Sequence, residues 1–316
     1  MAVETTTFSN NSADTWFRDI MFDCVLCPRA CHVNRLAGQT GYCGQTAELM
    51  AARASLHYWE EPCISGTSGS GTVFFSGCNL RCVFCQNHNI ALGKAGRVIA
   101  PEHLAEIFLQ LQEQGANNIN LVTPTHFLPQ IVIALEQAKQ QGLHLPIVYN
   151  TGSYESPEAL RHLEGLVDIY LPDLKNFSPE LSTAYCHAPD YFETACAAIS
   201  EMYRQVGDSV IDEDTGLMQH GMIVRHLLLP GQTKDSKKIL RYLHETYGDH
   251  IYISIMNQYT PLPQVADIEV LNRTVTPEEY DRVLRFAERI GIERGFRQEG
   301  TAASESLIPE FDERGL

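Results

Sequence analysis

The chain has 316 residues, with 23 Lys and Arg against 39 Asp and Glu, so its formal charge is −16. This acidity argues against nucleic acid as a partner, because nucleic-acid binding relies on Lys and Arg to neutralise phosphates. An apolar fraction of 44% and a charged fraction of 20% are typical of a globular chain with a full core, and the lack of any run of about 18 apolar residues predicts no membrane span.

Residues 1–70 are predicted to form an N-terminal segment. They begin with an acidic, polar stretch that does not resemble a signal peptide, so we expect a cytoplasmic protein with reduced thiols. Four cysteines follow in the spacing C-x2-C-x3-C-x11-C, and they are Cys24, Cys27, Cys31 and Cys43. Four such thiolates predict a second metal site holding zinc or an auxiliary iron–sulfur cluster, and the number of thiolates does not separate the two. A segment without metal remains the third possibility.

Residues 71–292 show a regular alternation of two patterns. Short apolar or β-branched runs predict buried strands at 72–76, 119–122, 147–149, 167–171, 222–229 and 251–256. Amphipathic stretches predict helices at 101–114, 128–141, 156–163, about 191–206, 236–247 and 277–289. Six strand-then-helix units predict an α/β fold with a parallel sheet and right-handed crossovers, arranged as an open or closed barrel or as a doubly wound sheet. Residues 293–316 form a C-terminal extension.

Polar residues follow each predicted strand. The segments are GCNLRC, TPTH, NTG, PDLK, PG and NQY, in chain order. Ligand sites of parallel α/β folds lie at the carboxyl ends of the strands. The six segments are therefore expected to converge on one cavity.

A second group of cysteines comes directly after the first strand. Cys78, Cys82 and Cys85 stand in a C-x3-C-x2-C spacing within the segment SGCNLRCVFCQN. Neighbouring thiolates in a tight loop suit one soft metal centre, and three ligands leave one coordination position open for chemistry. A [4Fe–4S] cluster with one unligated iron and a catalytic zinc are the two candidates.

This segment resembles the C-x3-C-x-aromatic-C signature of radical S-adenosylmethionine (SAM) enzymes, with Phe84 at the aromatic position. The resemblance implies a partial (β/α)6 barrel, a [4Fe–4S] cluster on the three cysteines, and SAM bound to the fourth iron. It also implies reductive cleavage of SAM to a 5′-deoxyadenosyl radical that abstracts hydrogen from a substrate.

The chain is more closely similar to pyruvate formate-lyase activating enzymes and their uncharacterised relatives with N-terminal cysteine segments. The likeness rests on GCNLRCVFCQN, NINLVTPTHFLPQI, IVYNTGSYES, VDIYLPDLKNF, IVRHLLLPGQTKDS and MNQYTP, and it spans about residues 20–290. It implies a flavodoxin- or ferredoxin-type reductant and a glycyl-radical protein or peptide as substrate. A small-molecule substrate and a non-catalytic electron-transfer or metal-binding protein are the alternatives.

The likeness also implies the cofactor-binding residues. Asp173 and Lys175 are expected near the methionyl end of SAM, and Asn150 and Thr151 near its carboxylate or ribose. The activating enzymes carry G-G-E-P after the second strand, whereas this chain has Thr123-Pro124-Thr125-His126. The complete set of residues expected to bind the cofactors is Phe84, Asn87, Thr123, Thr125, His126, Asn150, Thr151, Asp173, Lys175 and Arg225.

Several of the singled-out residues have a plainer interpretation. A lone His is more often a structural hydrogen-bond partner, and we favour that for His126. Arg225 is expected either to bind a carboxylate or to pair with Asp168 or Asp173. Solvated surface acids are the favoured interpretation of Glu60 and Glu61, although contact with SAM or substrate is the alternative. Cys186 and Cys196 are expected to be small buried residues.

Overall fold

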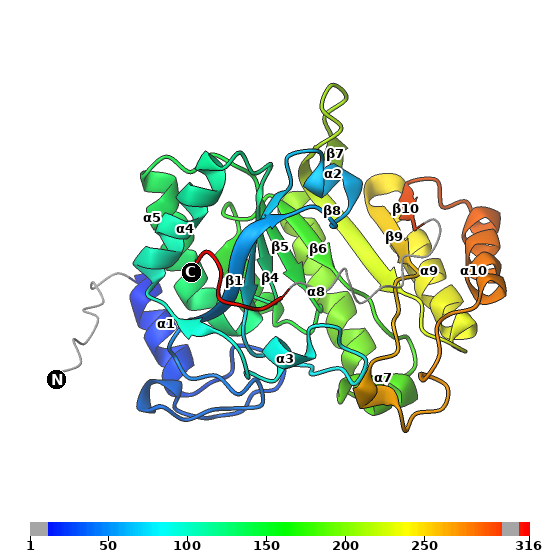
Figure 1. Ribbon diagram of the computed structural model, residues 1–316, viewed down its shortest axis with the longest axis horizontal. Helices are drawn as coiled ribbons and strands as arrows, with labels where there is room; N and C mark the ends of the chain where they lie inside the picture. Colours follow the sequence, from blue (N-terminus) through cyan, green and yellow to red (C-terminus); the bar gives the residue numbers. More distant parts are fainter. Residues whose placement is uncertain (1–11, 299–309) are drawn as a thin grey trace.

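An open, mostly parallel sheet forms the centre of the computed structural model, which describes residues 12–298 and 310–316. The strand order is β10-β9-β8-β6-β5-β4-β2-β1-β3, so within the described residues the two edge strands do not meet (Figure 1). This arrangement confirms the α/β partial barrel. The parallel strands are β2 (Ser70–Phe75), β4 (Ile119–Val122), β5 (Ile147–Thr151), β6 (Ile169–Pro172), β8 (Met218–Leu227), β9 (Tyr252–Met256) and β10 (Gly295–Arg297).

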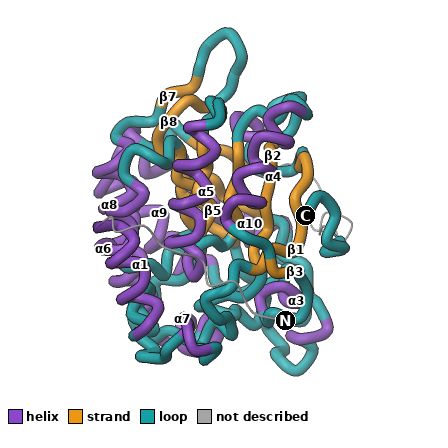
Figure 2. Tube along the Cα trace, turned by 90° about the vertical axis from the view of Figure 1, so that its left-hand side faces the viewer, coloured by secondary structure: helices purple, strands orange, loops and turns teal. Residues whose placement is uncertain are grey.

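The inner strands are buried on both faces, as their sequences predict. Every residue of β2, β4, β5 and β6 is buried. Helices connect these strands and lie along the sheet, with α4 beside α5 and α9 beside α10, so that the strands form an inner layer (Figures 1 and 2). The longer helices are α4 (Pro101–Glu113), α5 (Leu128–Gln140), α7 (Pro179–Cys186), α8 (Tyr191–Val206), α9 (Thr233–Tyr247) and α10 (Pro277–Ile290).

The N-terminal segment contributes to the same sheet. Its strand β1 (Met50–His57) pairs antiparallel with β2, and β3 (Arg97–Val98) pairs antiparallel with β1. The run MAARASLH has no strong alternation, which is why the sequence pattern did not predict this strand. The remaining helices are α1 (Ser12–Phe22), α2 (Pro62–Ser65), α3 (His88–Ala91) and α6 (Pro157–Leu160), and β7 (Val210–Ile211) pairs with β8.

Residues 310–316 run along β1 at the edge of the sheet. The backbone N–H of Ala54 donates to the carbonyl of Arg314 at 2.9 Å, and that of Glu313 donates to the carbonyl of Ala52 at 3.1 Å. The ring of Phe311 packs edge-on against Phe74, with centroids 5.4 Å apart. The end of the chain therefore covers backbone groups of β1 that would otherwise be unpaired.

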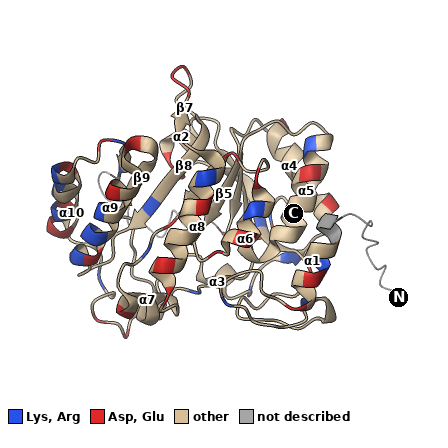
Figure 3. Cartoon of the chain, turned by 180° about the vertical axis from the view of Figure 1, so that it is seen from behind, with Lys and Arg blue, Asp and Glu red and all other residues tan. Residues whose placement is uncertain are grey.

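Charged residues of both signs are interspersed on the outer helices, as Figure 3 shows for α9 and α10. None of the described helices combines the length and the apolar character that crossing a bilayer requires.

Candidate active site

A cavity of about 430 Å³ lies at the carboxyl ends of the parallel strands. Segments following β2, β4, β5, β6 and β9 all reach it, so five of the six predicted polar segments converge there; Pro230 and Gly231 are not among its lining residues. Its walls include Cys78, Cys82, Phe84, Cys85, Asn87, Thr123, Asn150, Thr151, Asp173, Lys175 and Arg225. Eleven residues that the sequence singled out are therefore brought together.

The loop after β2 turns the three thiols toward this cavity. Two residues adopt left-handed backbone conformations, Gly77 with φ 93° and Arg81 with φ 54°, and they allow the tight turn around Cys78. The backbone N–H groups of Leu80 and Arg81 point at the Cys78 Sγ, at 3.3 and 3.5 Å. Such donors stabilise a thiolate and suit a metal ligand.

The donor set fits the cluster that the resemblance implies. Burial raises the pKa of Cys78, and it raises the pKa of Cys85 to about 12, whereas the positive charge of Lys175 acts in the opposite direction on both. A bound metal would displace these thiol protons. In residues 12–298 and 310–316, no group of three or more His, Cys, Asp or Glu side chains is arranged to hold a single metal ion.

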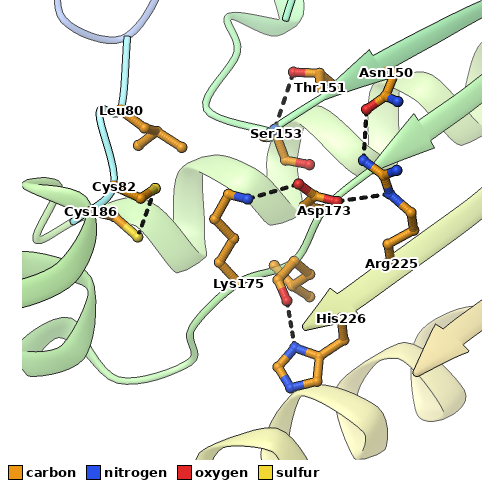
Figure 4. Close-up of polar contacts among 12 residues, drawn as sticks. Leu80, Cys82, Asn150, Thr151, Ser153, Asp173, Lys175, Cys186, Arg225 and His226 are labelled. Atoms are coloured by element: carbon orange, nitrogen blue, oxygen red, sulfur yellow. Dashed lines mark hydrogen bonds and ion pairs between the residues drawn. The ribbon is translucent and has the colours of Figure 1, made fainter. Parts of the chain in front are cut away.

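Cys186 meets the cysteine loop, although 104 residues separate it from Cys82. Its Sγ lies 3.4 Å from the Cys82 Sγ (Figure 4). The amide Nδ2 of Asn176 donates to the Cys186 Sγ at 3.3 Å. Cys186 is buried as expected, but it has a partner that the spacing did not reveal. Only the packing of α7 against the loop, where the Val83 N–H donates to the carbonyl of Tyr185, brings the two thiols together.

An ion network forms the opposite wall of the cavity. The Arg225 guanidinium pairs with Asp173 at 2.9 Å and with Glu60 at 3.1 Å, and it donates to the Asn150 Oδ1 at 2.6 Å. The Lys175 ammonium pairs with the second oxygen of Asp173 at 2.7 Å (Figure 4). Burial alone would raise the pKa of Asp173, but the two cations outweigh it and hold that pKa below the usual range.

Glu60 and Glu61 are not solvated surface acids. They lie between β1 and α2, and both line the cavity. The Glu60 side chain is only 11% exposed because it pairs with Arg225. Burial raises the pKa of Glu61. Arg225 thus forms the expected ion pair with Asp173, whereas Asp168 accepts instead from the backbone N–H of Ile147 at 2.8 Å.

Thr125 and His126 are not among the residues lining the large cavity. Residues 125–127 form a 3-10 turn that directs the Thr125 hydroxyl to Glu155, at 2.6 Å. The His126 Nε2 lies 2.7 Å from the carbonyl of Ser76, and burial lowers the pKa of its ring to about 3. A neutral ring then donates from Nε2 to that carbonyl, which is the structural role favoured from the sequence. Its Nδ1 is buried and has no hydrogen-bond partner in the part of the chain that the structure describes.

The four N-terminal cysteines line a second, much smaller cavity of about 10 Å³. His126 lies in its wall together with Arg29 and Arg35. The segment packs directly on the loop that carries the other three cysteines: Arg29 donates to the carbonyl of Asn79 at 2.8 Å, and the Tyr42 hydroxyl donates to that of Leu80 at 3.2 Å.

Comparison with known proteins identifies the family. The model of the Radical SAM superfamily matches residues 72–243, more than half of the chain. The chain is 27% identical over 286 residues to an uncharacterized protein of Methanocaldococcus jannaschii, covering 87% of this chain and 77% of that one. A pyruvate formate-lyase-activating enzyme of Clostridium pasteurianum is 29% identical over 121 residues, which are 36% of this chain and 48% of that enzyme.

A solved domain of a pyruvate-formate lyase-activating enzyme from Bacteroides vulgatus is also similar. It shares 15% identity with a TM-score of 0.42, and the match covers 58% of this chain and the whole of that domain.

The chain belongs to the Radical SAM superfamily, whose members are enzymes. Membership implies a [4Fe–4S] cluster and SAM as cofactors. The resemblance of the C-x3-C-x2-C segment is thereby confirmed at the level of the family.

Proposed function

We propose that this enzyme cleaves SAM reductively at a cluster held by Cys78, Cys82 and Cys85 and abstracts a hydrogen atom from a substrate. One observation carries the proposal: the three thiols and the polar ends of the parallel strands share a single cavity of about 430 Å³. A cluster held there would supply the one electron that splits SAM into methionine and a 5′-deoxyadenosyl radical.

The residues of the cavity wall have distinct roles in this proposal. Lys175 lies close enough to the three thiols to act electrostatically on each of them, so its ammonium favours their thiolate forms and attracts the carboxylate of SAM. Asp173 holds that ammonium in place. Asn150, Thr151 and the turn at Thr123 line the same cavity and offer hydrogen bonds to the polar parts of SAM.

The test is anaerobic reconstitution with iron and sulfide, followed by dithionite and SAM. We expect 5′-deoxyadenosine to form, and we expect Cys82→Ala to abolish it. Cys196→Ala is the matched control, because Cys196 lies on α8 and lines neither cysteine cavity, and it should leave product formation unchanged. Normal product formation by Cys82→Ala, or none by the reconstituted wild type, would overturn the proposal.

For the substrate, we propose a glycyl-radical protein or peptide, with a flavodoxin- or ferredoxin-type protein as the reductant. The support is the likeness to the activating enzyme of Clostridium pasteurianum. The test offers a Gly-containing loop peptide of a glycyl-radical protein together with SAM and dithionite. A Gly-centred radical detected by electron paramagnetic resonance (EPR) supports this substrate, whereas SAM cleavage that yields no protein radical points to a small molecule.

We also propose that Cys24, Cys27, Cys31 and Cys43 form a second metal site. All four are free thiols that line one cavity, and they belong to a segment that packs on the catalytic loop. Metal bound there would stabilise the segment and, through it, the loop.

A further inference from the structure

Two cysteines that are far apart in the sequence lie in direct contact beside the large cavity. The Sγ atoms of Cys82 and Cys186 are 3.4 Å apart, and both residues are free thiols. Figure 4 shows the two side chains pointing toward each other, one from the catalytic loop and one from the end of α7. Among the described residues, no other pair of cysteine sulfur atoms is in hydrogen-bonding contact. These two thiols are therefore the pair best placed to react with each other.

The backbone on both sides of this pair is held in place. The Val83 N–H donates to the carbonyl of Tyr185 at 2.9 Å, which joins the residue after one thiol to the residue before the other. The Arg29 guanidinium donates to the carbonyls of Asn79 and His187 at 2.8 and 2.7 Å and joins the same two segments again. A disulfide bond is about 2.0 Å long, so the two sulfur atoms need to approach by about 1.4 Å. Rotation about the side-chain bonds can supply that movement while these backbone contacts persist.

The two thiols differ in their access to the cavity. Cys82 lines the cavity of about 430 Å³, so a small oxidant that enters it meets this sulfur. Cys186 is not among the lining residues and is 0% exposed, and Asn176 donates to its sulfur at 3.3 Å. An accessible thiol beside a buried one is an arrangement in which the first can be oxidised and the second can resolve the product.

We propose that Cys82 and Cys186 form a site of reversible oxidation, which reacts when Cys82 is not bound to iron. Hydrogen peroxide transfers one oxygen atom to the Cys82 thiol, which becomes a sulfenic acid, and one water molecule leaves. The Cys186 thiol then attacks the Cys82 sulfur, the disulfide forms, and the oxygen leaves as a second water molecule. In total the two thiols lose two electrons and two protons, and the peroxide takes them up.

This inference rests on the proposed function, because the disulfide engages one of the three proposed cluster ligands. A chain with this disulfide lacks the Cys82 thiolate, so it does not cleave SAM until a thiol reductant restores it. The disulfide also keeps Cys82 from oxidation to a sulfinic acid, which thiol reductants do not reverse. The site therefore preserves the ligand set of the loop through exposure to peroxide.

The experiment uses the full chain, freed of metal by a chelator and treated anaerobically with hydrogen peroxide. Remaining thiols are alkylated, and mass spectrometry of a digest made without reductant maps the linkages of every cysteine. We expect Cys186 to be the main partner of Cys82, and we expect dithiothreitol to release both thiols. A main linkage of Cys82 to Cys78 or Cys85, or no disulfide at Cys82, would refute the proposal. This measurement needs only the wild-type chain.

Cys186→Ser tests the protective role. After peroxide and then dithiothreitol, the wild type should bind as much iron on reconstitution as an untreated sample. The variant should bind about four irons per chain fewer than its own untreated sample, because its Cys82 has passed to the sulfinic acid. Cys196→Ala is the matched control, since Cys196 lines neither cysteine cavity, and it should recover like the wild type. Equal recovery by Cys186→Ser and the wild type would contradict the protective role.

The linkage map and the iron content are both measured without SAM. A chain that forms and reverses this disulfide but yields no 5′-deoxyadenosine would therefore contradict the proposed SAM cleavage alone. A chain that cleaves SAM but links Cys82 to another cysteine would contradict only the oxidation site.

Discussion

Cys186 is the residue whose position is least expected from its neighbours in the sequence. Its thiol lies against a cysteine of the catalytic loop, and Asn176 orients it by donating to its sulfur. Hydrogen bonds to the sulfur ligands of a cluster stabilise its more negative, reduced state and raise its reduction potential. Cys186 is thus placed to act on the cluster through Cys82 without being a ligand.

We predict that Cys186→Ala makes the reduction potential of the cluster proposed at Cys78, Cys82 and Cys85 more negative. The shift should be about 40 mV for a hydrogen bond worth about 1 kcal/mol. Cys186→Ser keeps a donor and should retain most of the wild-type value. The measurement is a redox titration followed by EPR on anaerobic protein. Equal potentials for the Ala and Ser variants would show that Cys186 only fills space.

Glu155 is a buried carboxyl group that follows β5. Its Oε1 accepts from the hydroxyls of Thr125 and Thr151 at 2.6 and 2.5 Å, whereas its Oε2 has no hydrogen-bond partner among the described residues. Burial raises its pKa from 4.5 to about 7, and the hydroxyl donors only partly oppose this shift. The folded chain therefore binds a proton here in a pH range where the unfolded chain has released it.

Because the folded-state pKa of Glu155 is the higher one, its contribution to the free energy of unfolding falls as the pH rises from about 4.5 to about 7. The loss amounts to about 3 kcal/mol over that range. Glu155→Gln has no charge to bury, so urea denaturation of this variant should show a flatter dependence on pH. A wild-type slope in the variant would mean that other groups cause the effect.

Among the elements, β6, β8 and the turn before α2 are tied together at the active site by one ion network. Asp173 follows β6, Arg225 belongs to β8 and Glu60 precedes α2, while Lys175 completes the set. These side chains are 11–18% exposed, so solvent screens them only partly. Asp173 is the central member because it pairs with both cations.

We predict that Asp173→Asn lowers the free energy of unfolding by about 3 kcal/mol, because it leaves two largely buried cations with one carboxylate fewer. Glu60→Gln should cost less, since Arg225 keeps its pair with Asp173. Both values follow from urea denaturation of anaerobic protein at neutral pH. The reverse order of the two costs would contradict the central place given to Asp173.

At the scale of the whole molecule, residues 310–316 cover the edge of the sheet beside β1. The segment hydrogen-bonds to β1 and places Phe311 on Phe74. A strand left open at an edge is a template for pairing with other chains. The C-terminal segment therefore contributes both to stability and to solubility.

Deletion of residues 310–316 should lower the Tm and promote association. Phe311→Ala alone should cost about 3 kcal/mol at most, because only the ring contact is lost and the backbone pairs remain. Thermal unfolding combined with light scattering measures both effects. An unchanged Tm and a monodisperse deletion variant would show that the edge needs no cover.

Much of this architecture followed from local patterns. Apolar runs predicted β4 at its observed bounds and the other five strands to within a few residues, because a strand buried on both faces must be apolar throughout. The spacing of Cys78, Cys82 and Cys85 predicted the family, since a three-thiolate loop needs residues in fixed local order. β1 and β10 were not predicted, because their short, mixed sequences become strands only beside β2 and β9.

Contacts between residues that are far apart in the sequence could not be predicted from it, and only the folded structure shows them. No spacing shows that Cys186 meets Cys82, that Glu60 pairs with Arg225, or that His126 faces the N-terminal cysteines instead of the large cavity. The number of thiolates at the N-terminus is the same for zinc and for a cluster, so the count does not identify the metal. Local chemistry specifies which groups are present, and only packing sets the distances that decide what they bind.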